Sequence, residues 1–184
     1  PAQDVEPVIM ACGGEHGARD LAVVLLLARL GLRAGEVANL KIGNIDWRNG
    51  RLAVRSGKSK RTEWLPLTQQ AGDAIIAYLK RARPRHRSDR LFLTEIAPIR
   101  PITRITVKCI VRRAILRAGV ESPNKGAHVL RHSAATAMLR HGVSLDGVRA
   151  VLRLASPQMT MHYAKVDIGL LSEITQPWSG RPSC

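Results

Sequence analysis

Hydrophobic positions recur at three- and four-residue spacing along most of the chain, which is the pattern of amphipathic helices. The segment 17–30 is apolar almost all round, as is typical of a helix buried in a core. Gly31 is expected to end this helix, and Gly142 is expected to end a later one that begins near His128. Further helices are predicted over residues 5–12, 33–40, 68–80, 103–118 and 144–152, with Thr68 as an N-cap.

The predicted helix over 103–118 carries two kinds of side chain. We expect its inward face to hold Ile105, Cys109, Ile110 and Ile115. We expect its outward face to hold Lys108, Arg112, Arg113 and Arg117. Such a charged face is usually a solvated one, so its expected part in binding is diffuse attraction.

Three short segments between the helices have the character of strands. They cover residues 42–47, 51–55 and 62–67, and Leu52 and Val54 share one face of the middle segment. Turn residues 48–50 and 56–61 separate them, which predicts a three-stranded antiparallel sheet. The expected fold is therefore α+β, mainly helical with one small sheet.

The charge balance narrows the class of partner. The chain has 184 residues, with 29 Lys and Arg against 14 Asp and Glu, a formal net charge of +15. Because 45% of its residues are hydrophobic, this is a folded basic domain rather than a disordered basic tail. Nucleic acid is the partner that such a surface favours, with a basic surface of no such role as the alternative. Aromatic residues make up 3% of the chain, too few for stacking single strands, so duplex DNA is the expected ligand.

Basic residues gather in two segments outside the predicted helices. The turn at 56–61 is either a solvated hairpin tip or a loop that enters a DNA groove, and the connector at 80–90 is expected to be loosely structured. The residues expected to contribute to DNA binding are Lys60, Arg61, Arg83, Arg85, Arg87, Arg104 and Lys108.

Cysteine usage and hydropathy exclude other classes. Cys12, Cys109 and Cys184 are widely spaced, so neither a disulfide framework nor a zinc site is expected, and a reducing cytoplasm suits them. The longest apolar run, 21–28, is far shorter than the roughly 18 residues that span a bilayer.

Two places in the chain have residues suited to binding an anion. His128 and Arg131 lie three residues apart at the start of a predicted helix, where free N–H groups and the helix dipole favour negative charge. Their alternative is an ordinary His and Arg at the solvated end of a core helix. Arg33 lies between two apolar helices, so it either pairs with Glu36 or binds an anion.

Four motifs occur in one order along the chain. They are Gly31–Glu36, then Gly57–Lys58, then His128–His132, then Met161–Tyr163. In order and spacing the chain resembles the catalytic domain of the tyrosine recombinases, the phage-integrase family. The resemblance implies a mostly helical domain with a small three-stranded sheet over residues 1–176, followed by a tail over 177–184. It also implies an N-terminal DNA-clamping domain outside this chain, which begins at Pro1 rather than at Met.

The resemblance implies a role for each matching residue. Arg33 and Arg131 would clamp the scissile phosphate, and Lys58 would protonate the leaving 5′ oxygen. His128 would help to take the nucleophile's proton, and Tyr163 would attack phosphorus to leave a 3′-phosphotyrosine and a free 5′-OH. This chemistry needs neither a metal nor a high-energy cofactor. The residue types agree, because two guanidiniums stabilise the charge that builds on a phosphodiester.

The choice of nucleophile is between two tyrosines. Tyr78 lies in an amphipathic segment and is expected in the core. Tyr163 is therefore the candidate, and its alternative is a packing tyrosine near a helix end.

One position departs from the family pattern. Family members usually have Leu-Gly-His, less often with Trp for His, about nine residues before the tyrosine, whereas this chain has Leu152, Arg153 and Leu154. Leu154 cannot donate a hydrogen bond to the phosphate, and one lost donor costs about two to three powers of ten in rate. Substitutes for that donor would come from Arg153, His132 or His162. We predict that Leu154→His raises the cleavage rate.

The expected function is that of a site-specific DNA recombinase or integrase, acting as a homotetramer on two paired sites in bacterial cytoplasm, on nucleoid DNA. One rival is a decayed recombinase that binds DNA without cutting, and another is a type IB topoisomerase. The apolar segment 166–174 would dock either on a neighbouring subunit or on its own domain.

Overall fold

The computed structural model describes residues 5–13, 17–55, 61–121 and 126–154 of the chain. The chain divides into two compact units, residues 1–134 and 135–184. Each unit is described by itself.

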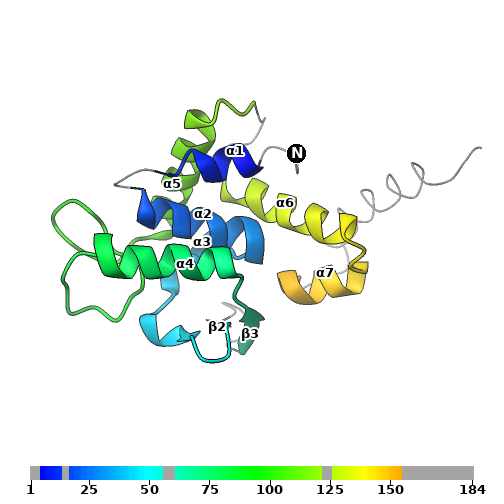
Figure 1. Cartoon of the computed structure of the whole chain (residues 1–184), viewed down its shortest axis with the longest axis horizontal. Helices are drawn as coiled ribbons and strands as arrows, with labels where there is room; N and C mark the ends of the chain where they lie inside the picture. Colours follow the sequence, from blue (N-terminus) through cyan, green and yellow to red (C-terminus); the bar gives the residue numbers. More distant parts are fainter. Residues whose placement is uncertain (1–4, 14–16, 56–60, 122–125, 155–184) are drawn as a thin grey trace, which may run out of the picture. The chain divides into compact units, whose positions relative to one another are not determined.

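The first unit is built around one buried helix. Its helices are α1 (Val5–Met10), α2 (Ala18–Leu30), α3 (Ala34–Asn39), α4 (Gln69–Ala77), α5 (Arg104–Arg117) and the beginning of α6 (Ala127–Arg140). Nearly all of α2 is buried, and it contacts α1, α4 and α5 (Figure 1). Gly31 ends α2 in the left-handed conformation, at φ 61°, which glycine adopts without steric cost. The predicted core helix and its terminator are therefore confirmed.

A three-stranded antiparallel sheet completes the first unit. Its strands are β1 (Ile45–Asp46), β2 (Arg51–Arg55) and β3 (Thr62–Pro66), in the order β1-β2-β3. Leu52 and Leu65 face each other in the register and are both buried, which sets the inner face of the sheet.

The first strand is shorter than predicted. Residues Ile42–Asn44 form a turn of 3-10 helix, because the Asn44 side chain accepts a hydrogen bond of 2.9 Å from the backbone N–H of Lys41. The hairpin turn that follows is held by Asp46, which accepts hydrogen bonds from Asn49 and Arg51. The Asn49 side chain and then Arg51 lower the pKa of Asp46 to about 2, so this carboxylate stays ionised at any ordinary pH.

The connector after α4 is more ordered than the sequence suggested. A turn of π-helix (Tyr78–Ala82) leads into it. The Arg83 guanidinium donates to the carbonyls of Ser88 at 2.8 Å, Arg90 at 2.9 Å and Leu91 at 3.2 Å. The Arg83 side chain, which was expected to contact DNA, thus donates its hydrogen bonds to three backbone carbonyls. Tyr78 is fully buried, as predicted, and its hydroxyl accepts a hydrogen bond from the N–H of Leu93.

Helix α5 is rotated relative to the prediction. Its buried residues are Val107, Ile110, Val111, Ala114 and Ile115. Ile105 is 69% exposed and Cys109 is exposed, so their predicted inward placement is wrong. The buried stripe starts at Val107, and two residues along a helix turn the side chain by about 200°, onto the opposite side.

The second unit has a small apolar core of its own. It contains the end of α6 and helix α7 (Leu145–Leu152), whose N-cap Ser144 accepts a hydrogen bond of 3.2 Å from the N–H of Gly147. The buried residues of this core are Ala135, Leu139, Val148, Leu152 and Leu154.

Several sequence predictions fall outside the described residues. They concern Lys58, Lys60, Tyr163, the segment 166–174 and the tail 177–184. Across the described ranges, no helix is long and apolar enough to span a membrane.

Candidate active site

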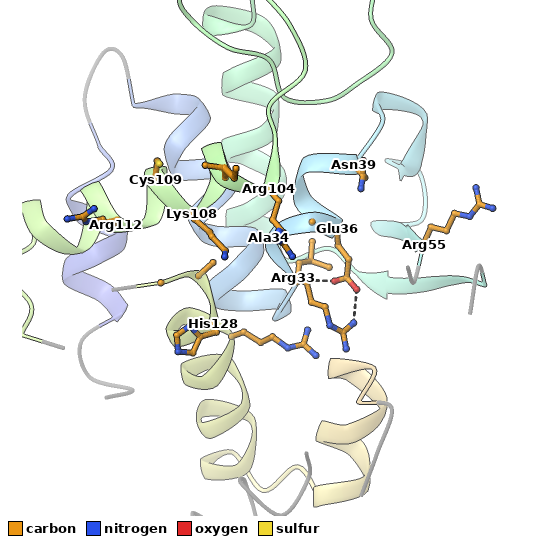
Figure 2. A pocket seen from close by; sticks show the side chains of 16 residues that line it. Arg33, Ala34, Glu36, Asn39, Arg55, Arg104, Lys108, Cys109, Arg112 and His128 are labelled. Carbon is orange, nitrogen blue, oxygen red and sulfur yellow. Dashed lines mark hydrogen bonds and ion pairs between the residues drawn. The ribbon is translucent and has the colours of Figure 1, made fainter. Parts of the chain in front are cut away.

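A single open cavity of about 930 Å³ in the first unit gathers most of the predicted phosphate ligands (Figure 2). Its walls come from α3, α5, the end of β2 and the first turn of α6. The charged residues that line it are Arg33, Glu36, Arg55, Arg104, Lys108, Arg112 and Arg131, with His128 beside them. Its lining is therefore strongly cationic, which suits an anion.

Arg33 is positioned by the start of α3. It is the N-cap residue, with extended backbone, and the Glu36 side chain accepts a hydrogen bond of 2.7 Å from its backbone N–H. The other carboxylate oxygen of Glu36 lies 2.8 Å from Nη1 of Arg33 (Figure 2). The predicted pairing is confirmed, and it holds both the main chain and the guanidinium of Arg33.

The exposures of the two partners differ. The Glu36 side chain is 6% exposed, whereas that of Arg33 is 37% exposed. The buried carboxylate of Glu36 therefore orients the half-buried guanidinium of Arg33. It leaves part of the guanidinium facing the cavity, so the two sequence readings of Arg33 are compatible.

Arg131 is anchored on the end of α2. It is 8% exposed, and its Nη1 donates a short hydrogen bond to the carbonyl of Gly31. The carbonyl end of a helix is partly negative, so it favours a cation there. The backbone carbonyl of Gly31 thus positions Arg131, and Arg33 follows Gly31 by two residues in the chain.

His128 lies on the exposed side of the first turn of α6. That turn starts with a hydrogen bond of 3.0 Å from the N–H of Val129 to the carbonyl of Gly126. A Cβ on Gly126 would lie 3.1 Å from Nδ1 of His128, so a glycine there leaves room for the imidazole. The ring also meets that of His132 edge-on, with centroids 6.4 Å apart.

Not all predicted residues meet in this cavity. Arg104 and Lys108 line it, and Figure 2 shows both on the α5 wall. Arg61, Arg85 and Arg87 are exposed elsewhere on the described surface and do not line it.

Sequence reasoning missed two basic residues of the cavity. Arg55 ends β2 immediately before the basic turn, and that place in the chain was the signal for it. Arg112 was assigned to a solvated face, although its position four residues after Lys108 was the signal that it shares a stripe with that lysine and Arg104.

The arrangement suits a phosphodiester. Two guanidiniums provide forked donors, an imidazole can hold or release a proton, and Lys108 adds a further positive charge. Among the described residues there is no cluster of three or more His, Cys, Asp or Glu side chains that would hold a metal ion.

Comparisons with known proteins identify the family of the chain. Residues 2–168 match the phage integrase family. The chain is 48% identical over 165 residues to a Sinorhizobium fredii protein named integrase/recombinase y4rA, covering 89% of the chain and 40% of that protein. It is 33% identical over 152 residues to tyrosine recombinase XerA of Thermococcus kodakarensis, covering 82% of the chain and 52% of that protein. A crystal structure of XerA recombinase superposes with a TM-score of 0.81 at 28% identity, covering 97% of the chain and 64% of that structure.

The chain thus spans less than half the length of y4rA and about half the length of the XerA sequence. What the matches share is the domain described above. The chain belongs to the phage integrase family and has the catalytic-domain fold of the tyrosine recombinases.

Proposed function

We propose that this chain is the catalytic domain of a site-specific DNA recombinase or integrase that cuts and rejoins duplex DNA through a 3′-phosphotyrosine. The observation that carries the proposal is the meeting of Arg33, His128 and Arg131 in one cationic cavity. Arg33 begins α3 and the other two residues lie on α6, and in the sequence each of the three lies in one of the motifs that resemble the family's. Family membership supports the same activity.

The chemistry assigns a step to each group. The Tyr163 oxygen attacks phosphorus while its proton passes towards His128, because a phenol with a pKa near 10 needs help at neutral pH. The two guanidiniums hold the non-bridging oxygens as charge builds on them. The bond to the 5′ oxygen breaks, and Lys58 gives that oxygen a proton. The phosphotyrosine keeps the bond energy, so the reverse attack by a 5′-OH rejoins a strand.

The proposal extends to partners. Duplex DNA is the substrate, two sites are held by a homotetramer, and the reaction takes place on nucleoid DNA in the cytoplasm. The catalytic domain covers residues 1–176, with 177–184 as a tail and the clamping domain in another part of a longer protein. The segment 166–174 docks on a neighbour or on its own domain.

A second candidate is a recombinase that binds DNA but cuts slowly or not at all. Leu154 favours it, because this residue lies buried in the apolar core of the second unit and has no hydrogen-bonding group. A type IB topoisomerase would relax one DNA without joining two sites, and the match to the phage integrase family argues against it.

The test is a cleavage assay on supercoiled plasmid carrying the candidate attachment site. We expect detergent-resistant protein–DNA adducts and relaxed circles with the wild-type chain, used with its native N-terminal region, and neither with Tyr163→Phe. Binding without adduct on that plasmid would favour the impaired form. Adducts that persist in Tyr163→Phe would contradict the phosphotyrosine mechanism. Relaxation without exchange between two sites would favour the topoisomerase.

A further inference from the structure

We propose that the exposed face of α5 reads base pairs beside the cut, with Ile105 and Cys109 against the methyl groups of thymine. We call this surface the α5 reading face, and it consists of Arg104, Ile105, Lys108, Cys109 and Arg112. The inference rests on the proposed function and adds to it a chemical basis for sequence preference.

The first observation is that two apolar side chains of α5 are exposed, although neither is needed for packing inside the protein. Ile105 is 69% exposed, and Cys109, one turn later, is exposed as well. The apolar residues that stabilise the fold lie on the other side of α5. Ile105 therefore contributes little to folding, and it lines the same cavity as Arg33 and Arg131.

The second observation is the order of charges around that apolar pair. Arg104, Lys108 and Arg112 recur every four residues, which places them in one stripe along the helix. Ile105 follows Arg104 and Cys109 follows Lys108, so these two form a second stripe beside the first. A cationic stripe beside an apolar stripe is complementary to a ligand that carries phosphates along its edges and an apolar group next to them. The net charge of +15 favours the same partner.

Duplex DNA presents such a surface in its major groove. The groove is about 12 Å wide and admits an α-helix, and thymine is the base that carries a methyl group there. Arginine beside it can bond guanine, and lysine or arginine at the edge can hold phosphate.

The cavity connects this face to the chemistry. A Cβ built on Gly35 would lie 3.8 Å from Cδ of Arg104, so α5 passes close to the start of α3, where Arg33 lies. Ile105 and Cys109 line the same cavity as Arg33 and Arg131. A phosphate held by Arg33 and Arg131 thus brings nearby base edges to the α5 reading face.

The test compares thymine with uracil, which differ by that methyl group alone. A randomised duplex library is selected for binding by the wild-type chain, by Ile105→Ala and by Leu116→Ala. Leu116 is the matched control, since it is 51% exposed on the same helix but does not line the cavity. Each preferred thymine in the selected duplex is then replaced by uracil, and the dissociation constants are measured.

We expect the wild-type chain to lose about fourfold in affinity at one or more thymines, the factor for one methyl group leaving an apolar contact. Ile105→Ala should lose the preference for thymine over uracil at the position that Ile105 contacts and keep it at a thymine that Cys109 contacts, and Leu116→Ala should behave as wild type. Equal sensitivity to uracil in wild type and Ile105→Ala would overturn the inference, as would selection of no thymine by the wild-type chain.

The two proposals fail in different ways. A Tyr163-dependent adduct without any effect of Ile105 on thymine leaves the proposed function standing and removes the α5 reading face. Absence of that adduct on the selected duplex, with uracil sensitivity that depends on Ile105, leaves a DNA reader and removes the proposed catalysis.

Discussion

Arg33 depends for its orientation on the carboxylate of Glu36. That carboxylate is 6% exposed and takes hydrogen bonds from both the backbone and the guanidinium of Arg33. Glu36 contacts neither phosphate nor nucleophile in the proposed chemistry, so it is a positioning residue.

We predict that Glu36→Gln lowers the rate of adduct formation by about tenfold or more, because a neutral amide holds the guanidinium less firmly. The same change should lower the free energy of unfolding by about 1–2 kcal/mol. Glu36→Asp should recover part of the rate, and Glu121→Gln, at an exposed site, should change neither quantity. A rate equal to wild type in Glu36→Gln at matched fraction folded would contradict this positioning role.

Leu154 is part of an apolar core, which its place in the sequence motif did not predict. It is 7% exposed and packs with the apolar residues of the second unit. The prediction that Leu154→His raises the cleavage rate stays open, and the structure adds a cost to it. We expect Leu154→His to lower the free energy of unfolding by about 1–3 kcal/mol, since a polar ring replaces an apolar contact.

Leu154→Ala is the matched control for that change, because it also removes buried apolar atoms but adds no donor. Chemical denaturation and single-turnover cleavage of both variants separate the two effects. If both variants cleave no faster than wild type, the lost donor does not limit the rate.

Helix α5 has apolar side chains on two sides, one buried in the protein and one exposed. Ile110 is fully buried, whereas Ile105 is 69% exposed. We predict that Ile110→Ala lowers the free energy of unfolding by about 2–5 kcal/mol, through lost transfer energy and the cavity left behind.

Ile105→Ala should change that free energy by no more than about 0.5 kcal/mol, as at other exposed sites. Urea denaturation of both variants measures the difference. Similar destabilisation of the two would mean that Ile105 packs against protein, and the α5 reading face would lose its basis.

The register of α5 also shows where sequence reasoning failed. Isoleucines stand at 105, 110 and 115, so more than one choice of inward face has helical spacing. The contacts that choose between them come from α2, α3 and α1, which lie at least 65 residues earlier (39 against 104) in chain order. Local periodicity predicts that a helix forms, but the partner elements decide which side they bury.

At the scale of the molecule, the excess of positive charge predicts a strong dependence of DNA binding on salt. Each phosphate contact adds about 0.9 to the slope of log affinity against log salt concentration. We predict that Lys108→Ala lowers that slope by about 1, since Lys108 lines the cationic cavity.

Lys41→Ala is the matched control, because the Lys41 ammonium already pairs with Asp89 at 2.7 Å and lies outside the cavity lining. Its slope should stay within error of wild type. Fluorescence anisotropy between about 50 and 200 mM salt covers the relevant range. An unchanged slope in Lys108→Ala would remove this lysine from the phosphate contacts.

Local patterns along the chain are enough to predict the fold class, most helices, the pairing of three strands and the family. Periodicity, caps and turn residues act over a few neighbouring positions, and the motifs lie in a fixed order, so both can be read along the chain. Contacts between different elements set the rest. They selected the buried face of α5, buried Leu154 and buried the carboxylate of Glu36. Each of these outcomes depends on which surfaces exclude water together, and no local pattern contains that information.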